Sequence, residues 1–149
     1  MKTLILGIGN PIVTDDSAGL KIAQRIKERN PELEVIEACS GALGLLDDIA
    51  GYDKLIIIDS VKTEGGKPGE LYKLELEDLP PASDLVTSHG VDIASAFKLG
   101  EGLGYKMPRS VSIYAVEIKD NTNFGEECTK EVAERIPALA QRIMEAENL

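Results

Sequence analysis

Three side chains in this sequence of 149 residues are candidates for binding a divalent transition metal together: the carboxylates of Asp16 and Asp59 and the only imidazole, His89. Two oxygen ligands and one imidazole suit nickel, zinc or manganese, and three protein ligands leave coordination positions open for a substrate group. Each residue also has a structural explanation. Asp16 could cap a following helix, Asp59 could end a strand in a turn, and His89 could lie in a first helical turn. The residue types alone leave both interpretations open.

The elements around these side chains predict an open α/β sheet. The aliphatic runs at 4–6 and 55–58 are typical of parallel strands that are covered on both faces. Between them lie an amphipathic helix over 19–26 and a short strand at 35–36. In such sheets, ligands bind beyond the carboxyl ends of the strands, where the strand order reverses. If the first and third strands are neighbours, Asp16 and Asp59 meet at one crevice, and the segment that contains His89 could fold over it.

The rest of the chain continues the alternation of strands and helices. We predict a short helix near 43–49, a half-exposed edge strand at 72–76 that runs antiparallel, and a loop over 78–88. The loop leads into a helix that contains Phe97 and ends at the glycines of 100–104. A strand over 111–115 and a last helix over 132–143, kinked by Pro137, complete the chain. The predicted fold class is α/β, with three layers, in one domain over residues 1–149.

Composition excludes several classes of partner. The chain has 16 Lys and Arg against 26 Asp and Glu, a net charge of −10, so its average surface repels nucleic acids and anionic membranes. The first apolar run is too short for a signal peptide, and no run reaches the roughly 18 residues needed to span a membrane. We therefore expect a cytoplasmic protein with reduced cysteines. The sequence has no heptad repeat and no long unpaired apolar strand, so we also expect a monomer.

Other motifs in the sequence give weaker indications of function. Gly7 and Gly9 match half of a dinucleotide fingerprint, but Ile12 replaces the third glycine, and the two aspartates that follow would repel a pyrophosphate. The sequence lacks the Gly-x-Ser-x-Gly motif of serine hydrolases. Cys39 could act as a nucleophile with His89 as its base, although a small buried thiol in a turn is the favoured interpretation.

Three motifs follow one another along the chain: Gly7-x-Gly9-Asn10-x-x-x-x-Asp15-Asp16-x-x-Gly19, an aliphatic strand that ends in Asp59, and Ser88-His89 before a helix. This order resembles the hydrogenase maturation endopeptidases over essentially the whole chain. Enzymes of that family remove a short C-terminal extension from the large-subunit precursor of a nickel-iron hydrogenase once nickel has been inserted. The resemblance implies a five-stranded twisted sheet, mostly parallel with one antiparallel edge strand.

The resemblance also implies roles for individual residues. It makes Asp16, Asp59 and His89 the residues that contact the metal, with Asp16 as the catalytic residue, acting as an aspartic-type general base or beside nickel as a Lewis acid. The implied substrate-binding residues are Gly9, Asn10, Asp15, Glu37, Ser40 and Gly41. Nickel would arrive with the partner, the nickel-loaded large-subunit precursor, and no tightly bound cofactor is expected. Two positions depart from the family pattern: Ser17 replaces a common Gly, and Glu37-Ala38-Cys39-Ser40-Gly41 replaces a turn of the Asp-Gly-Gly-Thr type.

Two alternative functions remain open at this point. Peptidyl-tRNA hydrolase also begins with a strand and Gly-Leu-Gly-Asn-Pro, much like residues 7–11 here, but its catalytic His follows soon afterwards. Residues 14–19 of this chain contain no His, and a net charge of −10 does not suit a tRNA ligand. The second alternative is a non-catalytic docking module that recognises the nickel-bearing precursor without cutting it. A change in the mass of the precursor distinguishes the enzyme from the module.

Overall fold

A computed structural model describes residues 1–38, 45–76 and 90–149 of the chain. The strands are β1 (Thr3–Ile8), β2 (Glu34–Ala38), β3 (Lys54–Val61), β4 (Leu71–Leu74) and β5 (Ser110–Glu117). The helices are a 3-10 turn η1 (Thr14–Ser17), α1 (Ala18–Arg29), α2 (Leu46–Ile49), α3 (Gly90–Gly102), α4 (Lys130–Ala133) and α5 (Ile136–Glu147). None of the helices in these residues combines the length and the apolar character that a membrane crossing requires.

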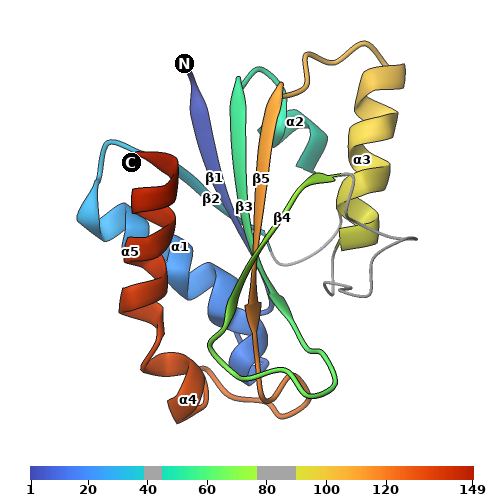
Figure 1. Ribbon diagram of the computed structural model, residues 1–149. Coiled ribbons are helices and arrows are strands. Elements are labelled where there is room, and N and C mark those ends of the chain that lie inside the picture. The colour runs from blue at the N-terminus through green and yellow to red at the C-terminus, as the bar shows by residue number, and fades with distance from the viewer. Residues whose placement is uncertain (39–44, 77–89) are drawn as a thin grey trace.

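The five strands form one sheet in the order β2-β1-β3-β5-β4 (Figure 1). Strand β1 pairs in parallel with both β2 and β3, and β3 pairs in parallel with β5. Strand β4 pairs antiparallel with β5 at the edge of the sheet. This arrangement confirms the predicted α/β fold class, its five-stranded mostly parallel sheet and its antiparallel edge strand.

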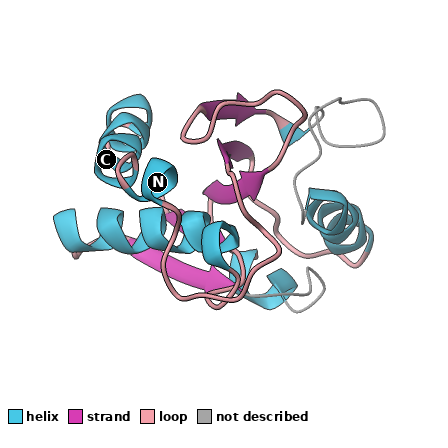
Figure 2. Ribbon diagram, turned by 90° about the horizontal axis from the view of Figure 1, so that it is seen from below, coloured by secondary structure: helices cyan, strands magenta, loops and turns pink. Residues whose placement is uncertain are grey.

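Helices cover both faces of the sheet. Helices α1 and α5 lie on one face and α2 and α3 on the other, as the view along the strands in Figure 2 shows. Side chains alternate along each strand, so Ile5 and Ile56 pack toward α1 and α5 whereas Leu4 and Leu55 pack toward α2 and α3. Burying each such side chain contributes about 1.5–3 kcal/mol. The aliphatic runs of β1 and β3 therefore follow from their place in the middle layer.

The C-terminal segment differs from the prediction of one kinked helix over 132–143. Helix α4 ends at Ala133 and a separate helix, α5, begins at Ile136. Pro137 lies in the first turn of α5, where a backbone N–H has no partner within the helix and its absence therefore costs no hydrogen bond. The proline starts a helix here instead of bending one.

Candidate active site

The strand order reverses between β1 and β3, which are neighbours with Gly7 opposite Ile58. Chain segments that leave these two strands therefore meet at the carboxyl edge of the sheet, as predicted. The segment after β1 leads through η1, which carries Asp15 and Asp16, and β3 carries Asp59 near its end. The fold thus brings two of the three predicted metal ligands to one edge.

The glycines of the first motif let η1 and α1 approach the strand ends. A Cβ atom added to Gly9 would come closer than 3.0 Å to the carbonyl oxygen of Asp16. One added to Gly19 would also come closer than 3.0 Å to the carbonyl oxygens of Ile8 and Ile58. Any larger residue would push the turn away from the sheet. These glycines serve close packing, and they fix the position of the backbone that carries Asp16.

Two hydrogen bonds orient the carboxylate of Asp16, which retains 9% exposure. Its Oδ1 accepts a hydrogen bond from the Ser60 hydroxyl at 2.9 Å, and its Oδ2 accepts one from the Asn10 backbone N–H at 3.0 Å. Asp59 is 1% exposed, and its Oδ1 accepts a hydrogen bond from the Ser60 backbone N–H at 2.7 Å. Ser60 therefore links the two carboxylates. The predicted substrate residue Asn10 contributes to this geometry through its backbone.

Asp15 has a different role from the substrate contact that the motif suggested. Its side chain is 0% exposed, and its oxygens accept hydrogen bonds from the backbone N–H groups of Lys119, Asp120 and Thr129 at 2.7–3.0 Å. The Thr129 hydroxyl donates to the same carboxylate. This carboxylate is fully used in joining η1 to the segment between β5 and α4, so it has no free face for a substrate.

The segment that Asp15 holds is itself ordered by a carboxylate. Asp120 accepts hydrogen bonds from the side chain of Asn123 and from the backbone N–H groups of Thr122 and Asn123. These bonds favour the charged form and hold the pKa of Asp120 well below its usual range. The segment then returns to η1, where the Thr14 N–H donates to the Gly125 carbonyl at 3.0 Å, and the Gly125 N–H donates to the carbonyl of Ile12, just before η1, at 2.8 Å. Neighbouring Phe124 is 84% exposed.

A pocket of about 470 Å³ lies beside η1. Glu37, predicted to bind substrate, lines it at the end of β2, and the half-exposed Ile12 lines it from the loop after β1. Ser17, one of the departures from the family pattern, also lines the pocket. Its hydroxyl donates to the Thr14 carbonyl at 2.7 Å, so this serine is accommodated within the turn. The pocket therefore offers apolar side chains together with charged groups of both signs beside η1.

Three predicted site residues, Ser40, Gly41 and His89, lie outside the described residues, as does Cys39. Within residues 1–38, 45–76 and 90–149, no group of three His, Cys, Asp or Glu side chains could hold a metal ion. The proposed set needs His89 as its third member, so the three-residue metal contact stays a prediction.

The sequence interpretation assigned no role to two residues at this edge, Ser60, which directly follows the predicted ligand Asp59, and Glu117. Glu117 ends β5 with 0% exposure and accepts hydrogen bonds from the Thr63 N–H at 2.8 Å, from the Thr63 hydroxyl and from the Tyr72 hydroxyl at 3.1 Å. Burial, together with hydrogen bonds to Glu70 and Glu117, raises the pKa of Tyr72 to about 12. The signal was available, because both residues are polar and stand at the ends of buried apolar strands.

The chain matches the family model described as "Hydrogenase maturation protease" over residues 19–146. It is 27% identical over 120 residues to the hydrogenase 2 maturation protease of Escherichia coli, a match that covers 78% of this chain and 73% of that protein. It is 31% identical over 120 residues to protein HydD of Wolinella succinogenes, covering 77% of this chain and 72% of the relative.

Solved structures show the same fold. The hydrogenase maturating endopeptidase HybD from Escherichia coli superimposes with a TM-score of 0.80 at 24% identity, covering 98% of this chain and 91% of that one. The [NiFe] hydrogenase maturation protease HybD from Thermococcus kodakarensis gives 0.83 at 24% identity, covering 98% and 99%. The resemblance seen in the motifs is confirmed: the chain is a peptidase that belongs to the hydrogenase maturation protease family.

Proposed function

We propose that this protein is the endopeptidase that removes the C-terminal extension of a nickel-iron hydrogenase large-subunit precursor after nickel has been inserted. The observation that carries the proposal is the pair of buried carboxylates, Asp16 and Asp59, at the point where the strand order reverses. Membership in the hydrogenase maturation protease family supports the class of substrate. The relative named hydrogenase 2 maturation protease supports it further.

In this proposal, Asp16 is the general base of an aspartic-type hydrolysis. Its carboxylate takes a proton from a water molecule as the water oxygen attacks the scissile carbonyl carbon. The proton then passes to the leaving amine as the peptide bond breaks. The hydrogen bonds from Ser60 and Asn10 fix the plane of the carboxylate and leave each of its oxygens a further lone pair.

Nickel enters as part of the substrate and serves recognition. We propose that Asp16, Asp59 and His89 contact nickel that the thiolates of the precursor already hold. An empty precursor offers these ligands nothing to bind and loses that part of the affinity, so cleavage waits for metal insertion. No tightly bound cofactor of the enzyme is required.

The pocket beside η1 is the proposed binding place for the residues next to the scissile bond. Ile12 presents an exposed apolar side chain there, and Glu37 supplies an acid. Gly9, Ser40 and Gly41 complete the proposed substrate-binding set from the family pattern. We assign the reaction to a cytoplasmic monomer, and size-exclusion chromatography with light scattering tests the oligomeric state.

Intact mass spectrometry of the precursor tests the proposal. Nickel-loaded and nickel-free precursors are incubated with the wild-type protein, with Asp16→Asn, and with Asp48→Asn as a control in which the same change is made on an exposed residue of α2. We expect loss of a C-terminal peptide only from the loaded form, with the wild type and the control but not with Asp16→Asn. Binding of the loaded precursor without any change in mass would favour the docking module instead.

A further inference from the structure

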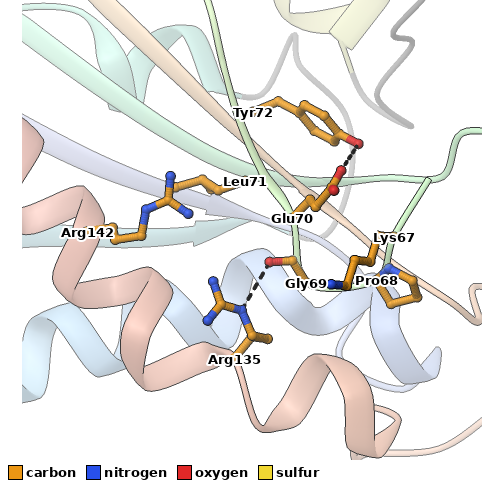
Figure 3. A pocket seen from close by; sticks show the side chains of 8 residues that line it. All are labelled: Lys67, Pro68, Gly69, Glu70, Leu71, Tyr72, Arg135 and Arg142. Carbon is orange, nitrogen blue, oxygen red and sulfur yellow. Dashed lines mark hydrogen bonds between the residues drawn. The ribbon is translucent and has the colours of Figure 1, made fainter.

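A second pocket, of about 470 Å³, lies between edge strand β4 and helix α5 (Figure 3). Its floor is formed by the residues that lead into β4, from Lys67 to Tyr72, and its wall by Arg135 and Arg142. Figure 3 shows both arginines reaching from the helical side toward the β4 backbone. We call this feature the β4–α5 groove, and nothing in the mechanism above uses it.

The groove is positively charged in a protein whose net charge is −10. Lys67, Arg135 and Arg142 line it, against one carboxylate, Glu70, which already accepts a hydrogen bond from the Tyr72 hydroxyl at 2.9 Å. Toward the described residues, the Arg135 side chain donates a single hydrogen bond, to the Gly69 carbonyl at 3.5 Å. Within the described part of the chain, neither Lys67 nor Arg142 forms an ion pair. Cations concentrated in one groove of an acidic surface favour an anionic ligand.

The same groove runs along an open strand edge. Strand β4 pairs only with β5 among the described strands, so its other side has no partner there. The backbone carbonyl of Glu70 accepts a hydrogen bond from the Glu117 N–H at 2.8 Å, and the N–H of Gly69 donates to the Glu117 carbonyl at 2.8 Å. Two residues thus face one, and Gly69 has a φ of +92°, so the pair forms a glycine β-bulge. Because bonded residues alternate in antiparallel pairs, Leu71 and Lys73 direct their backbone groups toward the open edge.

The register of the sheet places the groove close to the candidate active site. Tyr72 of β4 lies opposite Ala115 of β5, which in turn lies opposite Asp59 of β3. Two interstrand spacings separate the β4 backbone from Asp59, roughly 10 Å. A few residues of one extended peptide span that distance, so a single partner chain could occupy both places.

We propose that the β4–α5 groove docks an acidic, extended segment of the hydrogenase precursor. The segment adds to the sheet beside β4 through backbone hydrogen bonds, and its carboxylates face Arg135 and Arg142. The choice of partner rests on the proposed function, since the enzyme must hold the precursor at a second place while the scissile bond enters the active site. The groove raises the affinity for the precursor and takes no part in the chemistry.

Steady-state kinetics with the nickel-loaded precursor test this docking. The double variant Arg135→Gln/Arg142→Gln is compared with Lys98→Gln/Arg109→Gln, which removes the same charge from two exposed positions outside the groove, one in α3 and one just before β5. We expect about a tenfold higher KM for the first variant with kcat unchanged, and wild-type values for the control. The KM of the wild type should also rise with salt more steeply than that of the double variant. An unchanged KM in a double variant with a wild-type Tm would overturn the proposal.

A direct binding measurement separates this proposal from the proposed function. An unlabelled peptide of alternating Glu and Val is titrated into the isotope-labelled wild-type protein while the backbone amide NMR shifts of the protein are followed. We expect shifts at 67–74 and 135–142 that vanish in the double variant, and none with the matching Lys-Val peptide. Shifts confined to other residues, or equal binding of the two peptides, would refute the groove. If the wild type fails to cleave the precursor, the proposed function is lost, yet this titration still decides whether the groove binds acidic peptides.

Discussion

We expect the substitution of aspartate by asparagine to affect different properties at the adjacent positions 15 and 16: stability at 15 and activity at 16. Asp15 is completely buried and accepts hydrogen bonds from three backbone N–H groups. Asp16 keeps some exposure and accepts hydrogen bonds from one backbone N–H and one hydroxyl. Asp15→Asn should therefore lower the free energy of unfolding, and Asp16→Asn should remove the activity.

The magnitude at position 15 follows from the donors that surround it. The Lys119 and Asp120 N–H groups point at Oδ2, and the Thr129 N–H points at Oδ1. In either orientation the new NH₂ group faces at least one donor, and a buried unsatisfied N–H costs about 1–3 kcal/mol. The remaining bonds lose their charge, which adds about 1 kcal/mol. The sum, about 2–4 kcal/mol, is a large part of a typical stability of about 5–15 kcal/mol.

At position 16 the amide can satisfy both partners. Its oxygen accepts from the Asn10 N–H, and its NH₂ group donates to the Ser60 hydroxyl, which accepts as readily as it donates. The stability should stay within about 1 kcal/mol of the wild type. An amide cannot take up the proton of the attacking water, so kcat should fall at least about a hundredfold.

Urea unfolding followed by far-UV circular dichroism measures the stability of both variants, since the chain contains no Trp. Activity is measured from the intact mass of the loaded precursor at a temperature where both variants are folded. Asp15→Asn should then retain activity. The reasoning is refuted if Asp15→Asn is as stable as the wild type, or if Asp16→Asn cleaves at the wild-type rate.

Gly9→Ala should lower the free energy of urea unfolding by about 1–3 kcal/mol because its Cβ meets the Asp16 carbonyl, whereas Gly102→Ala, with open space around it, should change it by less than about 0.5 kcal/mol. Equal effects would contradict the packing argument. Ser60→Ala should lower kcat about tenfold and leave KM unchanged, because the Asp16 carboxylate loses one orienting bond; a change confined to KM would oppose this role. Glu147→Gln should lower the free energy of unfolding by about 2–3 kcal/mol at neutral pH, because it removes the carboxylate that forms a 2.6 Å ion pair with Lys54 of β3. Burial raises the pKa of Glu147, but hydrogen bonds from that lysine, Tyr114 and Ser112 lower it overall. The contribution is therefore present above the usual Glu pKa and is lost as the pH falls through the lower value in the folded protein, so wild type and variant should converge in acid urea titrations and not in neutral ones.

The sequence was sufficient to predict most of the fold because the strongest pattern is also the one that the core requires. Residues 55–58 are continuously aliphatic because helices cover both faces of β3. The break near Pro137 could not be predicted in the same way. A proline that bends a helix and a proline that starts one stand in similar apolar surroundings, and only the packing of α5 decides between them.

The candidate site was predictable in its location and not in the roles of its members. Asp15 and Asp16 are identical in type and adjacent in sequence, so no local pattern separates the buried structural carboxylate from the one proposed to be catalytic. What separates them is the segment at 119–129, which returns to η1 from a distant part of the chain. The role of Ser60 likewise depends on the pairing of β1 with β3, which brings it beside Asp16.

The hydrogen bonds that hold Asp15 join residues 104, 105 and 114 positions apart in sequence. Contacts of such long range form late in folding, because a large loop must close before they contribute. A nascent chain made only as far as β5 lacks the donors that hold Asp15, so η1, which also carries Asp16, is not yet anchored to the segment at 119–129. With Asp16 as the proposed base, we expect proteolytic competence to arrive only with the last third of the chain, so that a partly synthesised enzyme does not cleave the other proteins around the ribosome.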